Sequence, residues 1–424
     1  MLTVITIGAV VLLLVGIPMW MIFLLAAITG MVWQGVSMEV MVQGLTGSIN
    51  QLVLLSVPGF IFAGGVMGQG GMSARLIKWV SAFLGRVPGG MALTTIASAE
   101  VFGAISGSSS AAVAALGPIL YPALIKEGYG ERFSLGLITS SGCIAIIIPP
   151  SITMILFAVM TNASVGKLFL AGFLPGIVVG LCAAVYCVGF AIKHRVASDR
   201  RWSLEEIART SREVVWTLGA PALIAVGIYG GYMTPTEAAM AVSVYAVFVT
   251  VFIYRELTWK QIWAITRETA LLSAKIFIIV AAAAAFSWIL TAEAVPQKMV
   301  GVIDGLGLSP VMVLVMINLI LLVVGMFMDP GSAVILFAPL LWPIAQHSGV
   351  DLIHFGIIYT VNLAIGMFSP PFGMNIFVSC SIFNKSSSRV VSGLMGFFIP
   401  YLIALVIITY VPALSLTLPN LLMN

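Results

Sequence analysis

Two clusters of oxygen-bearing residues interrupt apolar segments of this 424-residue chain. The first is Ser106-Gly-Ser-Ser-Ser110 and the second is Asp329-Pro-Gly-Ser332. Hydroxyl, carboxylate and freed carbonyl oxygens are the ligands that hard cations such as Na+ prefer. A carboxylate at membrane depth is costly and marks an ion or substrate path, so Asp329 is the most informative single residue. It could also be the N-cap of a helix that starts at Pro330, and the two roles are compatible.

A proline break follows each cluster at the same distance. Pro118 and Pro149 are 31 residues apart, as are Pro339 and Pro370, and adding 221 to the first pair gives the second. A proline supplies no N–H and leaves an upstream carbonyl unpaired, so carbonyls at these breaks are further candidate ligands. Duplicated, interrupted apolar segments are typical of the ion and substrate site of a secondary transporter built from inverted repeats.

The composition places these breaks in a membrane. The chain is 61% hydrophobic and 8% charged, and its mean hydropathy is +1.15. We therefore predict an all-α integral membrane protein, in which interrupted helices face protein or water because lipid leaves backbone groups unpaired. The net charge of +4 comes from Lys and Arg in a few loops and reports orientation, so no nucleic-acid partner is expected. The cysteines lack metal-ligand spacing, and the N-terminus lacks the basic region of a signal peptide.

We expect one polytopic domain, 1–424, with two re-entrant helical hairpins and two broken spanning helices. Repeat 1 covers about 1–160, a linking helix and loop about 165–213, repeat 2 about 215–383, and a final helix about 389–416. The expected elements are two spans in 3–33, broken at Gly16-Ile-Pro18, a span at 50–70, an interfacial stretch at 71–90, hairpins at 91–125 and 309–345, broken spans at 133–160 and 353–383, and helices at 168–192, 215–232, 235–254 and 271–291.

Charge predicts the orientation of the two halves. The loop 193–213 carries six Lys and Arg residues and should be cytoplasmic. Counting each hairpin as a same-side return, 71–90 falls inside and its counterpart 292–308 outside, which agrees with three basic residues in the first and mixed charges in the second. The halves are thus expected to be inverted, with the hairpins meeting near the midplane and both termini periplasmic.

A substrate carboxylate could be held by the N-termini of the half-helices, because their free N–H groups and dipole favour anions. The alternative for any single serine is Ser/Gly helix packing inside a bundle. The candidate substrate residues are Ser108, Ser109, Ser110, Ser141, Gly331, Ser332 and Asn362.

The chain resembles the large membrane subunit of the tripartite ATP-independent periplasmic (TRAP) transporters, part of the ion transporter superfamily of elevator-type carriers. The resemblance covers nearly the whole chain and rests on Ser106-Gly-Ser-Ser-Ser-Ala-Ala112, Gly117-Pro118, Ile148-Pro-Pro-Ser151, Thr234-Pro-Thr-Glu-Ala238, Gly325-Met-Phe-Met-Asp329 and Ser369-Pro-Pro371. It implies Na+ sites at the hairpin tips and broken spans. The corresponding residues are Ser106, Gly107, Ser108, Ala145, Ile148, Pro149 and Pro150 in the first half, and Gly325, Met328, Asp329, Gly366, Ser369 and Pro370 in the second.

The resemblance further implies Na+-driven uptake of an organic acid across a bacterial inner membrane. A periplasmic substrate-binding protein would deliver the acid, and a small four-helix membrane subunit would be a separate chain. Sialic acid is the first expected substrate and a C4-dicarboxylate is the alternative. A stand-alone Na+/organic-anion symporter of the same superfamily is a further possibility.

Two other classes compete with the transporter. An intramembrane serine protease would use Ser106 or Ser108 as nucleophile, but His194, His347 and His354 all lie off the spans that could reach these serines, so no enzyme is expected. An ion channel would tolerate the Gly/Ser breaks. Channel filters, however, are usually symmetric through oligomerisation and not through internal inversion.

Overall fold

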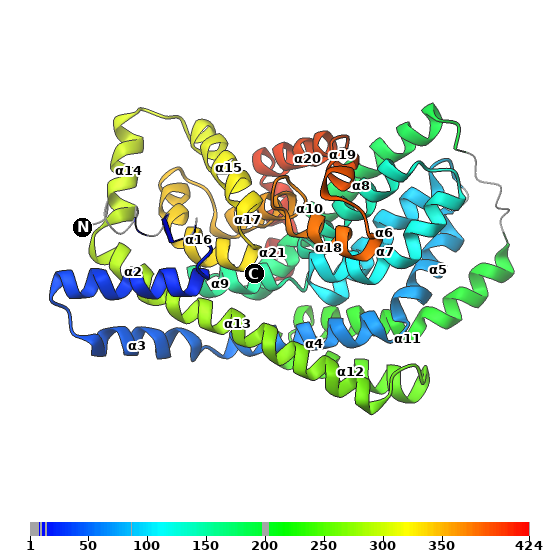
Figure 1. Ribbon diagram of the computed structural model, residues 1–424, viewed down its shortest axis with the longest axis horizontal. Coiled ribbons are helices and arrows are strands. Elements are labelled where there is room, and N and C mark those ends of the chain that lie inside the picture. Colours follow the sequence, from blue (N-terminus) through cyan, green and yellow to red (C-terminus); the bar gives the residue numbers. More distant parts are fainter. Residues whose placement is uncertain (1–7, 9–10, 13–14, 86, 197–202, 424) are drawn as a thin grey trace.

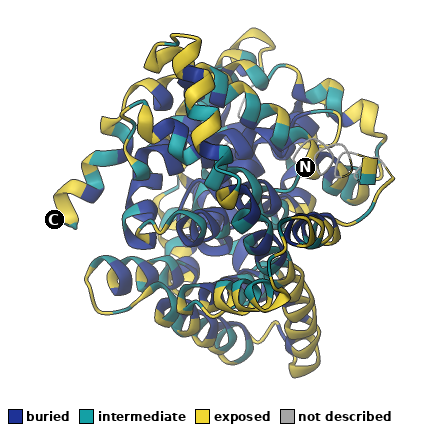
Figure 2. Cartoon of the chain, turned by 90° about the vertical axis from the view of Figure 1, so that its left-hand side faces the viewer, coloured by how far each residue is buried: buried dark blue, intermediate teal, exposed yellow. Residues whose placement is uncertain are grey.

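The computed structural model describes residues 8, 11–12, 15–85, 87–196 and 203–423, and within these all regular secondary structure is helical. Seven helices among them are long and apolar enough to cross a membrane, or eight if one bent pair counts as a span. Buried residues concentrate in the middle of the molecule and exposed ones on the outer helices (Figure 2). The all-helical, many-spanning class expected from composition is confirmed.

One group of helices lacks the interruptions that occur in the two hairpins and the two broken spans. It comprises α2 (Met19–Gln34), α3 (Met38–Ile49), η1 (Leu52–Leu55), α4 (Ser56–Gln69), α11 (Leu204–Tyr229), α12 (Pro235–Phe248), the π-helical turn η3 (Val249–Ile253) and α13 (Trp259–Ala292). α12 packs closely on α4, where the Ser243 hydroxyl donates to the Gly59 carbonyl at 2.9 Å. A capping box of Thr234 and Glu237 starts α12. The expected break at Gly16-Ile-Pro18 precedes α2, and most of 1–14 lies outside the described residues.

α13 differs from the prediction. We expected a helix at 271–291, whereas α13 is one continuous helix of 34 residues that starts at Trp259 and runs along α2 and α3 (Figure 1). The segment from Trp259 to Ala292 contains no Gly or Pro, and a capping box of Thr258 and Gln261 starts it. Nothing in the backbone therefore interrupts the helix between its polar and apolar parts. α11 likewise begins earlier than expected, at Leu204.

The interrupted elements have the predicted breaks. The first pair is α6 (Gly90–Ser106) and α7 (Ser109–Lys126), and the second is α15 (Pro310–Phe327) and α16 (Pro330–His347). The first broken span is α8 (Glu131–Ser141), η2 (Gly142–Ile146) and α9 (Ile152–Thr161), and the second is α17 (Leu352–Gly366) and α18 (Met374–Phe383). The bounds of α16 are those of α7 plus 221. The Pro149-Pro150 and Pro370-Pro371 bonds are both cis.

The four interrupted elements interlock across the two halves of the chain. α7 of the first half packs on α18 of the second, and α16 of the second packs on α9 of the first. The long helix α10 (Val165–Lys193) packs against α6, α9 and α17. Each hairpin tip is therefore held by residues of both halves.

The C-terminal segment also differs from the prediction. The single helix expected at 389–416 is three helices, α19 (Ser387–Leu394), α20 (Phe398–Tyr410) and α21 (Ala413–Leu422), with a bend of 55° between the first two. Gly396 lies at the bend, and Pro412 precedes α21. Glycine and proline break helices for conformational and steric reasons, so these residues account for the interruptions.

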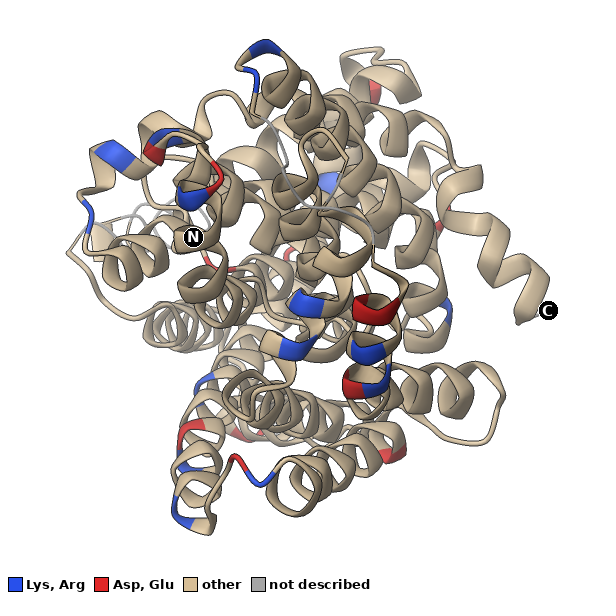
Figure 3. Cartoon of the chain, turned by 90° about the vertical axis from the view of Figure 1, so that its right-hand side faces the viewer, with Lys and Arg blue, Asp and Glu red and all other residues tan. Residues whose placement is uncertain are grey.

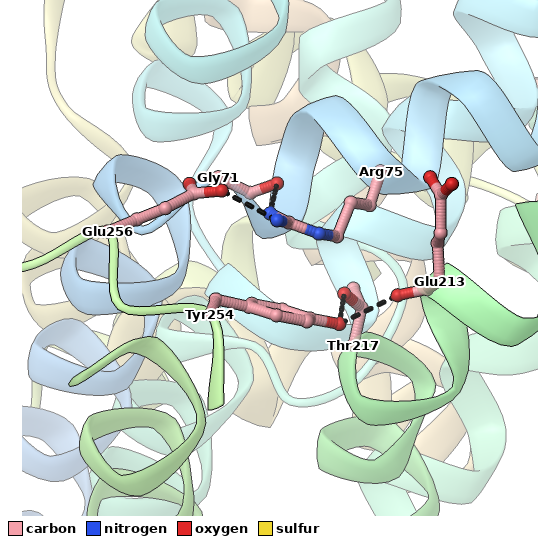
Figure 4. A network of polar contacts seen from close by, with 6 residues as sticks. All are labelled: Gly71, Arg75, Glu213, Thr217, Tyr254 and Glu256. Atoms are coloured by element: carbon pink, nitrogen blue, oxygen red, sulfur yellow. Dashed lines mark hydrogen bonds and ion pairs between the residues drawn. The ribbon is translucent and has the colours of Figure 1, made fainter. Parts of the chain in front are cut away.

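Two segments that were assigned to the cytoplasmic side, 71–90 and 193–213, meet the short connection before α13 in the structure. The Arg75 guanidinium, on α5 (Met72–Leu84), is 2.6 Å from the Glu256 carboxylate and lies over the Tyr254 ring at 3.8 Å (Figure 4). The Tyr254 hydroxyl donates to the Glu213 carbonyl at 2.8 Å. Arg75 belongs to 71–90, Glu213 ends 193–213, and Tyr254 and Glu256 lie between η3 and α13. Arg200 and Arg201 of the expected cytoplasmic loop lie outside the described residues.

The counterpart of α5 lies at the other end of the molecule. α14 (Val295–Gly305) stands at the left of Figure 1, whereas α5 and α11 stand at the right. Figure 3 views that right-hand end, where charged residues of both signs are visible. α5 and α14 thus lie far apart, and the inversion of the two halves, with 71–90 and 292–308 on opposite sides of the membrane, stays a prediction.

Candidate functional site: a cavity between two helix tips

The first hairpin tip is a two-residue turn held against the first proline break. α6 ends at Gly107, whose φ of 58° is left-handed, and the Ser108 side chain then caps α7 by accepting from the Ala111 N–H at 3.5 Å. A Cβ placed on Gly107 would lie 2.3 Å from the Pro150 carbonyl oxygen. Glycine is therefore required for both the conformation and the contact. The tip and the break bring backbone oxygens together.

The second tip has a parallel construction with a different capping residue. Asp329 caps α16: its carboxylate accepts from the Ser332 N–H at 3.0 Å and from the Ser332 hydroxyl at 2.6 Å. Pro330 occupies the first helical position. Just before this tip, a Cβ on Gly366 would lie 2.5 Å from the Gly325 Cα, so hairpin and broken span meet backbone to backbone. The N-cap role foreseen for Asp329 is present.

Both tips line one cavity of about 590 Å³. It brings together, from the predicted site, Ser106, Gly107, Ser108, Ser109, Ser110, Asp329 and Gly331. The first residues of four helices, α7, α9, α16 and α18, are all among its lining residues. The first turn of a helix has N–H groups without intrahelical partners and carries the positive end of the dipole. Their convergence gives the cavity the means to hold a carboxylate.

The remaining predicted residues lie behind the lining. Of the substrate candidates, Ser141 donates to the Ile138 carbonyl at 3.3 Å, and Asn362 donates to Asn318 at 2.7 Å. Ser332 is occupied with the cap described above. The cavity therefore does not bring these three together with the other substrate candidates. The ion candidates outside the lining are Ala145, Ile148, Pro149, Pro150, Gly325, Met328, Gly366, Ser369 and Pro370.

Those ion candidates nevertheless flank the tips. The Gly103 backbone approaches Ala145 so closely that a Cβ would lie 2.6 Å from the Ala145 Cα, and Gly107 and Gly366 make the contacts given above. Ser106 is 2% exposed, and its hydroxyl is buried without a hydrogen-bond partner. A buried hydroxyl without a partner costs free energy unless something else satisfies it. A hard cation among backbone carbonyls would do so, and the residues present fit Na+ in this respect.

The charge of the cavity wall is negative. Asp329 and Glu268 line it, and among the lining residues in the described part of the chain there is no Lys, Arg or His. Glu268, Thr269 and Gln69 were missed by the sequence analysis because they belong to α13 and α4, which carry no break. The available signal was weak: Ile265, Thr269, Leu272 and Ile276 recur at helical spacing around Glu268.

The histidines lie away from the cavity, each with its own partner. His354 contacts the Ser415 hydroxyl and the Thr409 carbonyl, both at 3.2 Å. His347 lies 2.9 Å from Asp304, and His194 lies 3.0 Å from a carbonyl of its own helix. Within the described residues, no group of three or more His, Cys, Asp or Glu could hold a metal ion. A serine nucleophile at either tip thus has no neighbouring imidazole base.

Comparison with known proteins identifies what this arrangement is similar to. The model of the tripartite ATP-independent periplasmic transporter, DctM component, matches residues 6–414. The C4-dicarboxylate TRAP transporter large permease protein DctM of Pseudomonas aeruginosa is 38% identical over 367 residues, covering 87% of this chain and 86% of that protein. The ectoine TRAP transporter large permease protein TeaC of Halomonas elongata is 38% identical over 413 residues, covering 97% of each.

Two further similarities extend this picture. The sialic acid TRAP transporter permease protein SiaT of Haemophilus influenzae is 32% identical over 419 residues, covering 97% of this chain and 67% of that protein. The crystal structure of the YdaH transporter of Alcanivorax borkumensis matches with a TM-score of 0.58 at 12% identity and covers 88% of both chains. At that identity the structural match speaks for the fold alone.

Proposed function

The chain belongs to the DctM family of large membrane subunits of TRAP transporters, and we propose from this that it carries out Na+-coupled uptake of an organic acid. Family membership makes it a multi-pass transporter permease and not an enzyme. The observation that carries the proposal is the single cavity that receives both hairpin tips and the first residues of four helices. A carrier needs an ion site and a substrate site that share moving parts, and the two tips are such parts.

The ion sites are placed at the two contacts between tip and break. The first uses Ser106, Gly107 and Ser108 with the carbonyls of the first proline break, and the second uses the Asp329 tip with the second break. The orphan Ser106 hydroxyl supports the first, and the close Gly325–Gly366 approach supports the second. Na+ seeks oxygen ligands, and both regions offer backbone and hydroxyl oxygens.

The proposed substrate site is at the helix starts that line the cavity, where Ser108, Ser109, Ser110 and Gly331 would bind the acid. Sialic acid and C4-dicarboxylates are both proposed, since relatives named for each are similar to this chain. One relative is named for ectoine, which is a zwitterion with a single carboxylate. A zwitterionic acid is therefore a third candidate substrate. The negative wall described above disfavours a dianion unless bound cations offset it.

The proposed partners follow from the family. They are a small four-helix membrane subunit and a periplasmic binding protein, in a bacterial inner membrane. A relative from Oleidesulfovibrio alaskensis is named as a DctMQ permease, and this chain covers 64% of its length. A stand-alone symporter that needs no binding protein is the alternative.

In the proposed movement, the two hairpins and the broken spans shift as a body against α4, α12 and α13. The cavity supports this division because its wall is formed by the tips on one side and by residues of α4 and α13 on the other. Inverted halves would let the same body reach either side of the membrane.

The test is uptake into proteoliposomes containing this chain and its small partner. A Na+ gradient is imposed with and without the binding protein, and sialic acid, succinate and ectoine are compared. Uptake that needs both Na+ and binding protein is expected. Uptake without the binding protein would establish the stand-alone alternative, and uptake without Na+ would refute the coupling.

A further inference from the structure

Asn375 is a fully buried polar residue whose hydrogen bonds cross from the second half of the chain to the first. It is the second residue of α18, and its exposed fraction is 0%. Its Nδ2 donates to the Ser109 hydroxyl at 2.7 Å and to the Thr139 carbonyl at 3.0 Å. Ser109 begins α7 at the first hairpin tip, and Thr139 lies in the first broken span. One amide therefore holds three interrupted elements together.

The orientation of this amide is fixed by its partners. A backbone carbonyl only accepts, so the Asn375 nitrogen and not its oxygen must face Thr139. The Asn375 Oδ1 is consequently directed elsewhere, and it is buried with no hydrogen-bond partner. A buried acceptor left unpaired is destabilising. Retaining such a group is understandable if the two donated bonds serve the site rather than the stability of the fold.

The contact lies next to the residues of the first proposed ion region. A Cβ on Gly142, the start of η2, would lie 3.1 Å from the Ser109 carbonyl oxygen and 3.5 Å from Asn375 Nδ2. Ser109 itself lines the cavity. The amide thus sets the distance between the helix start at the tip and the break that faces it.

The first half has no asparagine at the position that matches Asn375. Subtracting 221 from Asn375 gives Met154, an apolar residue of α9 whose methyl group packs towards Gly172 of α10. The cross-connection between halves is therefore one-sided at this position. It ties the start of α18, which lines the cavity through Met374, to the first tip and not to its own.

We propose that Asn375 is a positioning residue that couples the first ion region to the second broken span. This inference rests on the proposed Na+ coupling. When the first tip closes on its ion, Ser109 moves with it, and the amide carries α18 along. Ion binding at one half then prepares a helix start contributed by the other.

The test uses Asn375→Ala and Ser379→Ala as a matched pair. Ser379 is equally buried, lies one turn further along α18 and contacts the Thr139 side chain at 2.7 Å, but it does not line the cavity. Each variant is purified and reconstituted as the full chain with its partners. The Na+ concentration for half-maximal uptake, its Hill coefficient and the Na+-induced rise in melting temperature are measured.

Asn375→Ala removes both donated bonds. The lost bond to Ser109, which is the link to the first tip, should raise the half-saturating Na+ concentration about tenfold and lower the Hill coefficient. Ser379→Ala should lower the melting temperature without changing either Na+ parameter. If Asn375→Ala does not fold, Asn375→Leu is similar in size, has no donor and adds no buried charge, and it should show the same Na+ effect. Equal Na+ parameters in the wild type and these Asn375 variants would overturn the coupling role alone. A wild type without Na+ dependence would overturn the proposed function itself.

Discussion

Gly107→Ala tests whether the first hairpin tip and the first proline break act as one unit. The residue has a φ of 58°, and its Cβ would lie 2.3 Å from the Pro150 carbonyl oxygen. A left-handed alanine costs roughly 1–2 kcal/mol, and forcing a methyl group into a packed contact adds about 1–3 kcal/mol. The oxygen it meets belongs to backbone, which has little freedom to move aside. We therefore expect a destabilisation of about 2–5 kcal/mol together with loss of Na+-driven uptake.

Gly128→Ala is the matched control for this prediction. Gly128 follows α7, has a φ of 88°, and a Cβ there would meet nothing within 4 Å. It should therefore show the left-handed cost alone, roughly 1–2 kcal/mol, and retain uptake. The assay is the melting temperature of the purified chain with and without Na+, followed by uptake in proteoliposomes. Equal destabilisation and equal uptake in the two variants would refute the contact between tip and break.

Three further predictions follow from the geometry. Arg75→Ala removes an ion pair of 2.6 Å and a cation–π contact on α5, and should destabilise the folded chain by about 1–2 kcal/mol. Arg209→Ala is the control and should change the melting temperature little, because its ion pair is 3.9 Å long and the arginine side chain is 71% exposed. Gly366→Ala places a methyl group 2.5 Å from backbone of the second hairpin, and should abolish uptake, whereas Gly301→Ala, with open space around it, should not. Glu268→Gln removes a negative charge from the cavity wall. It should lower the KM for an anionic substrate a few-fold without changing the melting temperature, because a negative wall repels an anion that enters the cleft.

Local chemistry explains what the sequence could predict. The breaks in the hairpins and the broken spans follow from glycine, proline and capping residues, whose effects on the backbone need no tertiary information. Asp329 as an N-cap and the capping box at Thr234 are of this kind. The same logic accounts for the continuity of α13 once the absence of Gly and Pro between Trp259 and Ala292 is given its full weight.

Contacts between distant segments explain what the sequence could not predict. Glu268 lines the cavity only because α13 lies against the tips, and Asn375 reaches the first tip only because α18 packs on α7. Neither residue has a local pattern that distinguishes it from a solvated glutamate or a helix-capping asparagine. Ser141 and Asn362 stand at matching positions of the two halves but do not line the cavity, and their substrate role stays a prediction.

The arrangement of the two tips bears on how an ion gradient could drive a substrate. In each half, a glycine lets backbone meet backbone where tip and broken span touch, at Gly107 in the first and Gly325 in the second. Backbone carbonyls at such contacts are fixed in position only while both elements are in place, so an ion bound there would stabilise the closed contact relative to the open one. The first turns of α7 and α16 begin at these same tips and line the cavity. In the proposed mechanism, an ion that closes the tips therefore also places the N–H groups that hold the acid, and the binding of either ligand must favour the other by the same factor.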